Sequence, residues 1–121
     1  MSENKTPLTG SNSYENTFAE NTFERLFQSF IDFSIPTFKN ASSLTSLIKL
    51  TDEIEELKEA GILGNTDEIK DEYTDCFMCL LDSAARAGIS IIDLKIAFSK
   101  KLAINKNRKW VKNENNTYSH Q

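Results

Sequence analysis

Apolar residues recur at intervals of three and four positions along most of this chain, and that helical period is the strongest constraint on its fold. The stripe is clearest where Phe23, Leu26, Phe27 and Phe30 follow one another. The 121 residues include only four glycines and two prolines, too few for a domain of many short strands and turns. We therefore expect an all-α domain with no convincing strand.

Four helices are expected, over about residues 17–33, 41–60, 66–87 and 91–107. Capping signals precede them at Thr17 (with Glu20), Asn40 or Ser42, Asn65 and Ser90 (with Asp93). The first helix should end before Pro36, because the residue before a proline disfavours the helical conformation. Gly61 should end the second helix and Gly88 the third. Short connections make successive helices antiparallel, so the prediction is a compact four-helix bundle.

Both ends of the chain are polar. We expect residues 1–15 to be a disordered arm, 16–112 the folded domain and 113–121 a flexible tail. The first residues lack the apolar stretch of a signal peptide, and no segment approaches the roughly 20 apolar residues of a membrane span. A cytoplasmic protein is expected, with no membrane partner and with Cys76 and Cys79 as thiols inside the domain.

Charge is segregated along the chain. The net charge of −4 argues against a general nucleic-acid binder. Residues 51–75 nevertheless hold ten of the eighteen acids and only two bases, whereas residues 94–113 hold seven bases and no acid. Such runs can be ordinary solvated helix faces. The spacing of the charged residues within each run therefore has to distinguish a solvated face from a functional site.

The acidic run contains two pairs of carboxylates, Glu53 with Glu56 and Glu72 with Asp75, each spaced three residues apart. That spacing puts both members of a pair on one side of a helix, and a helical hairpin would make the two pairs face each other. Four converging carboxylates repel one another unless a cation such as Mg²⁺ lies between them. Two further acids could join the site, Asp52 and Asp82. The alternative is that all are ordinary surface acids.

The basic run places Lys101, Asn105 and Arg108 on one helix face. A point charge, an amide and a bidentate guanidinium together could hold a polyphosphate. A basic last turn that favours the helix dipole is the alternative. Phe33 and Phe38 flank the expected turn at Pro36, where a pocket for a nucleobase could form.

With these motifs in order, the chain resembles the all-α nucleoside triphosphate pyrophosphohydrolases of the MazG type, whose signature is ExxE on one helix and ExxD on the next. It is most similar to the dATP/dGTP pyrophosphohydrolase family of phages and bacteria. The likeness covers about residues 23–111 and includes FSIPTF at 33–38, LLDSAARAGIS at 80–90 and KLAINKNRKW at 101–110. Asp52 stands where many MazG-type proteins have Glu, and Lys39 stands where a glycine is common.

The resemblance implies hydrolysis of purine deoxynucleoside triphosphates, dATP or dGTP, to the monophosphate and pyrophosphate. It implies Glu53, Glu56, Glu72 and Asp75 as ligands of about two or three Mg²⁺ ions, for which Mn²⁺ could substitute. It also implies Lys101, Asn105 and Arg108 as triphosphate contacts. The biological setting would be control of the nucleotide pool or phage nucleotide metabolism in the host cytoplasm.

Three other functions stay open at this point. One is an acidic DNA mimic, although the basic run would interrupt a continuous negative face. The domain could be a non-catalytic helical interaction module whose acidic groove binds a basic partner. It could also hydrolyse a pyrimidine dNTP to the monophosphate and pyrophosphate, because the motif residues would contact phosphate and metal and not the base.

The apolar pattern and the resemblance both predict a homo-oligomer, either a dimer or a tetramer. Leu80 and Leu81 are adjacent and point about 100° apart on a helix, so one of them needs a second surface to cover it.

Overall fold

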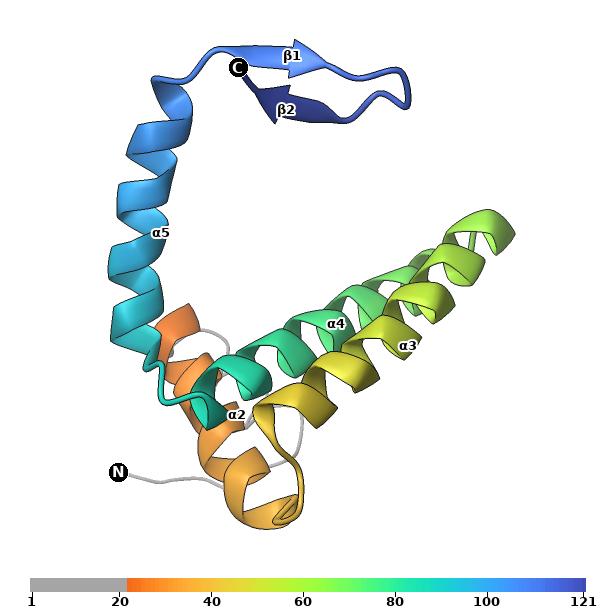
Figure 1. Ribbon diagram of the computed structural model, residues 1–121. Helices are drawn as coiled ribbons and strands as arrows, with labels where there is room; N and C mark the ends of the chain where they lie inside the picture. The colour runs from red at the N-terminus through yellow and green to blue at the C-terminus, as the bar shows by residue number, and fades with distance from the viewer. Residues whose placement is uncertain (1–21) are drawn as a thin grey trace. The chain divides into compact units, whose positions relative to one another are not determined.

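The computed structural model describes residues 22–121, which form four helices followed by a two-stranded hairpin (Figure 1). The expected helix start and capping box at Thr17, and the expected arm over residues 1–15, lie outside the described residues. Thr22 is extended, so the expectation that a helix runs through this position is wrong. The described chain divides after Gly88 into two units, which are considered separately below. No helix among residues 22–121 combines the length and apolar character that a membrane span requires.

Helix α2 (Phe23–Thr37) begins after Thr22, whose side chain accepts a hydrogen bond from the backbone N–H of Arg25. We expected this helix to end before Pro36, but it continues through the proline. A proline in the last turn leaves the helix short of a single N–H donor. The Thr37 hydroxyl donates to the Phe33 carbonyl at 2.5 Å and the Phe38 N–H donates to the Ser34 carbonyl at 2.9 Å, so the turn stays closed.

Helices α3 (Ser43–Leu63) and α4 (Thr66–Arg86) form a long antiparallel hairpin joined by Gly64 and Asn65 (Figure 1). The Ser42 capping box and the Asn65 cap confirm two of the predicted helix starts. The expected stop at Gly61 is wrong, because Gly61 lies inside α3 and the helix ends at Gly64. Gly64 has φ +76°, a left-handed conformation that glycine adopts at little cost.

The first unit, α2 to α4, buries more polar than apolar side chains. Ala60 and Leu81 are its buried apolar residues among those described. The buried polar residues are Ser34, Ser46, Glu53, Asp82 and Ser83. Helix α2 packs on α4, where the Phe27 and Phe77 rings lie 5.1 Å apart. Hydrogen bonding therefore holds much of this unit together.

The second unit contains α5 (Ile91–Lys106), β1 (Trp110–Lys112) and β2 (Tyr118–His120). The predicted capping box of Ser90 with Asp93 is present at the start of α5. The two strands pair antiparallel, with Trp110 opposite His120. This hairpin corrects the expectation that the chain has no strand, and it gives regular structure to part of the segment 113–121 that we expected to be a tail. The fold is otherwise helical, as predicted.

Candidate metal centre and adjoining pocket

Three of the four predicted metal ligands come together across the α3–α4 hairpin. The carboxylates of Glu53 and Glu56 on α3 and of Glu72 on α4 each offer one oxygen, and these three oxygens lie within 4.8 Å of one another. The two-residue connection at Gly64 and Asn65 makes this possible, because it folds the two acidic helix faces back on each other. We call this group the acidic cluster.

Glu72 is the member of the acidic cluster that has an unpartnered oxygen. Its Oε2 atom is buried and has no hydrogen-bond partner among the described residues. Burial raises the pKa of the Glu72 carboxyl, and the charges of Glu56 and Glu53 raise it further. A buried carboxylate oxygen without a donor, surrounded by like charge, is an arrangement that a bound cation would relieve.

Asp75, the fourth predicted ligand, lies one helical turn after Glu72 on α4. Burial raises the pKa of the Asp75 carboxyl, the Glu53 charge adds to this effect, and the charge of Lys49 opposes it. Asp75 is not one of the three residues of the acidic cluster, but it lines the same pocket as Glu53.

Lys49 is a site residue that the sequence analysis missed. Its Nζ donates to Glu53 Oε1 at 2.7 Å, and this hydrogen bond is the main cause of a raised Lys49 pKa. Lys49 precedes Glu53 by four residues on α3, a spacing that is itself the only sequence signal of the pair. The ammonium supplies the acidic cluster with one positive charge.

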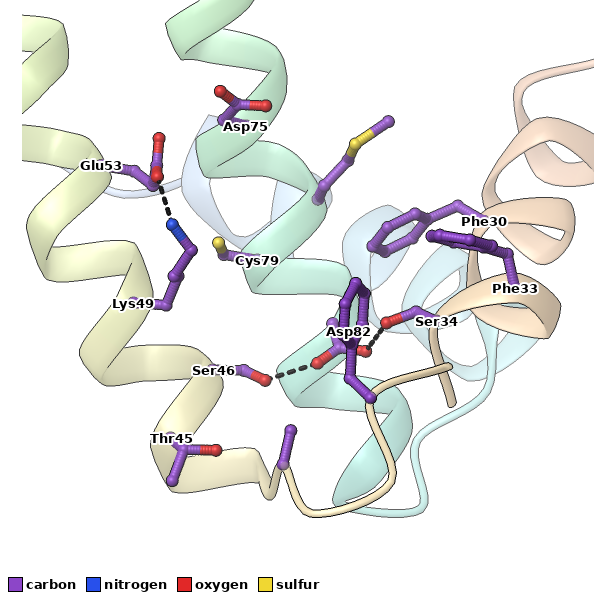
Figure 2. A pocket seen from close by; sticks show the side chains of 13 residues that line it. Phe30, Phe33, Ser34, Thr45, Ser46, Lys49, Glu53, Asp75, Cys79 and Asp82 are labelled. Carbon is purple, nitrogen blue, oxygen red and sulfur yellow. Dashed lines mark hydrogen bonds and ion pairs between the residues drawn. The ribbon is translucent and has the colours of Figure 1, made fainter. Parts of the chain in front are cut away.

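A pocket of about 550 Å³ adjoins the acidic cluster (Figure 2). Lys49, Glu53 and Asp75 lie on one side of it, and aromatic rings from α2 lie on the other (Figure 2). Phe33 and Phe38, the predicted base pocket, both line it with their rings 5.8 Å apart and edge to face. The exposed fractions of Phe33 and Phe38 are 56% and 51%, so these rings are open to contact rather than packed in a core.

The cysteines and the two additional acids fall in different environments. Cys76 and Cys79 are free thiols, as expected, but Cys79 lines the pocket instead of lying in a core. Asp52 is exposed and is not part of the acidic cluster or the pocket lining. Asp82 lines the pocket, but both of its oxygens already accept hydrogen bonds from Ser34, Ser46 and Arg86.

The predicted triphosphate contacts lie in the second unit. Lys101 and Asn105 are on α5, but Arg108 lies beyond the end of this helix, so the expectation that all three residues share one helix face is wrong for Arg108. Arg108 Nη1 donates to Asn105 Oδ1 at 3.3 Å, and Trp110 Nε1 donates to the Asn105 carbonyl at 3.0 Å. The structure thus brings Asn105 and Arg108 together, and the hairpin residue Trp110 supports them from β1.

The residues of the acidic cluster fit a hard divalent cation. All of its donors are carboxylate oxygens, the ligand type that Mg²⁺ and Mn²⁺ prefer. The unpartnered Glu72 Oε2 supplies a donor atom that no protein group uses among the described residues.

Three comparisons place this architecture among known proteins. Residues 26–120 match the dATP/dGTP pyrophosphohydrolase family. A dATP/dGTP diphosphohydrolase of Salmonella phage PMBT28 is 34% identical over 84 residues, which are 69% of this chain but only 26% of that longer protein. The MazG-like pyrophosphohydrolase of cyanophage S-2L, solved with dGDP and three catalytic Mn²⁺ ions per active site, is 27% identical with a TM-score of 0.66. That match covers 84% of this chain and 98% of the cyanophage chain. The chain belongs to the dATP/dGTP pyrophosphohydrolase family.

Proposed function

We propose that this protein hydrolyses the purine deoxynucleoside triphosphates dATP and dGTP to the monophosphate and pyrophosphate, with Mg²⁺ as its metal. The observation that carries the proposal is the acidic cluster, with its unpartnered Glu72 oxygen, beside a pocket with an aromatic wall. The family, the phage relative and the dGDP and Mn²⁺ bound by the cyanophage protein support it.

Each part of the substrate has a proposed partner. Glu53, Glu56, Glu72 and Asp75 would hold the divalent ions, which neutralise phosphate charge and lower the pKa of a bound water. The basic group of Lys101, Asn105 and Arg108 would bind the triphosphate oxygens. The aromatic wall of Phe33 and Phe38 would contact the nucleobase.

Lys49 has a role of its own in this proposal. Its ammonium lies 2.7 Å from Glu53 Oε1 and neutralises part of the negative charge of the acidic cluster. The hydrolysis itself needs positioning and charge stabilisation more than a protein nucleophile. Carboxylates, a basic helix face and an aromatic wall supply these without a serine, cysteine or histidine nucleophile.

We further propose that the active species is a homo-oligomer, a dimer or a tetramer, working in the nucleotide metabolism of a phage or its host. The exposed apolar residues of α3 and α4 support the oligomer, and the phage relative supports the setting. The cytoplasmic location and the absence of nucleic-acid and membrane partners stay predictions from the sequence.

The test is a pyrophosphate-release screen over the four dNTPs, dUTP and the ribonucleotides, with Mg²⁺, with Mn²⁺ and with chelator. We expect the highest kcat/KM with dATP or dGTP and no release with chelator. A preference for a pyrimidine dNTP would replace the substrate but keep the chemistry. No release from any nucleotide would contradict the enzyme and favour the interaction module.

The metal assignment has a variant test with a matched control. Glu72→Gln should abolish turnover, yet the melting temperature of the metal-free protein should stay equal or rise, because the change removes repulsion and adds a donor beside Glu53 and Glu56. Glu59→Gln makes the same change at an exposed position of α3 and should leave turnover unchanged. Wild-type turnover by Glu72→Gln at ordinary Mg²⁺ would contradict the metal site.

A further inference from the structure

A buried ion pair on α4 makes hydrogen bonds to α2, to α3 and to the segment that joins them. Arg86 Nε donates to Asp82 Oδ2 at 2.7 Å, and the two side chains are only 8% and 9% exposed. Asp82 Oδ1 accepts from the Ser34 hydroxyl of α2 at 2.5 Å, and Asp82 Oδ2 accepts from the Ser46 hydroxyl of α3. A single carboxylate therefore binds three helices together (Figure 2).

Arg86 extends this network to the backbone. Its Nη2 donates to the Ser34 carbonyl at 3.2 Å, and its Nη1 donates to the Ala41 carbonyl at 3.0 Å. These contacts hold the last turn of α2 and the segment that joins it to α3. Phe33 precedes Ser34, and Phe38 lies between the two carbonyls that Arg86 binds, so the anchored segment is the one that carries the aromatic wall.

The rings of the aromatic wall make few contacts of their own, although hydrogen bonds between Ser43 and Ser83 also tie the segment behind them to α4. Phe33 and Phe38 touch each other edge to face, and both rings are more than half exposed. The carboxylates of Glu53 and Asp75, on the opposite side of the pocket, belong to the α3–α4 hairpin. The spacing between wall and carboxylates is therefore set by how firmly the segment 34–46 is held to α4.

We infer that Asp82 and Arg86 are positioning residues for nucleotide binding, which hold the aromatic wall at the correct distance from the acidic side of the pocket. The inference rests on the proposed function and adds to it the residues that set base selection. Asp82 affects nucleotide binding by holding the aromatic wall in place. It is not a metal ligand, because both of its oxygens already accept hydrogen bonds from hydroxyl and guanidinium groups.

The test variant is Asp82→Asn, which keeps the shape of the side chain but removes its charge. We expect KM for dATP to rise about tenfold while kcat changes less than about threefold, since an interaction made equally in the ground and transition states is weakened. The preference for dATP over dCTP should fall by a similar factor. Asp32→Asn is the control, because Asp32 makes a local hydrogen bond with Gln28 on an exposed face of α2.

Two further measurements separate positioning from a general structural role and from metal binding. Mn²⁺ affinity, measured by electron paramagnetic resonance well below the melting temperature, should be the same in Asp82→Asn and wild type. A metal-ligand role predicts a large loss of that affinity, and loss of kcat in proportion to loss of folded protein would indicate stability alone. In a Phe38→Leu background, Asp82→Asn should raise KM by less than about twofold, because both changes act on one wall.

The outcomes discriminate this inference from the proposed function. If the wild type releases no pyrophosphate from any nucleotide, the proposed function is wrong and the inference falls with it. If the wild type is active and folded Asp82→Asn keeps its KM and base preference, the inference alone is overturned. If Asp82→Asn does not fold, Ser34→Ala decides, because it removes only the hydroxyl that Asp82 holds on α2: a raised KM at unchanged Mn²⁺ affinity supports the inference, and an unchanged KM overturns it.

Discussion

At the scale of single residues, the sequence was a good guide to which acids lie close together and a poor guide to which side chains hold one another through hydrogen bonds. The i, i+3 spacing predicted that Glu53, Glu56 and Glu72 converge, and their oxygens lie within 4.8 Å of one another. The role of Asp82 was not visible, because it depends on Ser34 and Ser46 reaching one carboxylate from helices far apart in the sequence. The spacing of residues along the sequence determines which side chains share a helix face, but only the tertiary fold determines which other side chains contact that face.

Asp82 should also give the fold a measurable pH dependence. Burial alone would raise the pKa of Asp82, but hydrogen bonds from Arg86, Ser34 and Ser46 and the Arg86 charge outweigh burial and lower it. A lowered carboxyl pKa stabilises the fold above the unfolded value of about 4, and that contribution is lost as the pH falls through the folded value.

We therefore expect the difference in unfolding free energy between wild type and Asp82→Asn to be largest at neutral pH and to shrink as the pH falls below about 4. Urea titrations at several pH values measure it, with Asp32→Asn as the variant whose difference stays small throughout. A gap that remains constant down to pH 2 would show that Asp82 does not carry this linkage.

The basic group makes the second prediction at this scale. Lys101→Ala and Arg108→Ala should each lower kcat/KM by roughly 10²-fold, about 2.7 kcal/mol of transition-state stabilisation. Lys106→Ala and Lys112→Ala remove exposed charges of the same run and should change kcat/KM little. If all four variants behave alike in steady-state assays, the run acts as a diffuse positive patch and the assignment of triphosphate binding to Lys101 and Arg108 is wrong.

At the scale of elements, both the starts and the ends of α4 and α5 were predictable, and so was the start of α3, whereas the ends of α2 and α3 were not. Starts at Ser42, Asn65 and Ser90 carry side-chain caps that sequence displays directly. Ends depend on backbone conformation: α2 runs through Pro36, and α3 runs through Gly61. The strands of the hairpin, only three residues each in a polar segment, are too short to show an alternating pattern.

Gly61 and Gly64 allow a test of these helix ends, since a methyl group at either position would meet no atom of the described residues within 4 Å beyond its chain neighbours and the local helix backbone. Gly61 lies in the interior of α3, so Gly61→Ala should stabilise the fold by about 0.5–1 kcal/mol. Gly64 has φ +76°, so Gly64→Ala should destabilise it by about 1 kcal/mol. Chemical denaturation of the two variants measures both, and equal signs would contradict the observed end of α3.

At the scale of the whole molecule, the first unit exposes many large apolar side chains, which its own packing does not explain. The sequence predicted that Leu80 and Leu81 could not share one core, and in the structure Leu81 is 7% exposed while Leu80 is 54% exposed. Further exposed apolar residues of the α3–α4 hairpin are Leu44, Leu47, Ile48, Ile54, Ile62, Leu63, Tyr73, Phe77 and Met78. So much exposed apolar surface on one hairpin is typical of an interface between chains.

The proposed homo-oligomer follows from this surface and can be tested on it. Light scattering or sedimentation at micromolar protein should give the mass of a dimer or a tetramer. Leu80→Glu should shift the mass toward the monomer, because a charge at that position would have to be buried in the interface, whereas Leu80→Met keeps an apolar side chain of similar volume and should keep the assembly. A wild-type monomer with full turnover would show that one chain suffices for the site and that the exposed residues of α3 and α4 have another role.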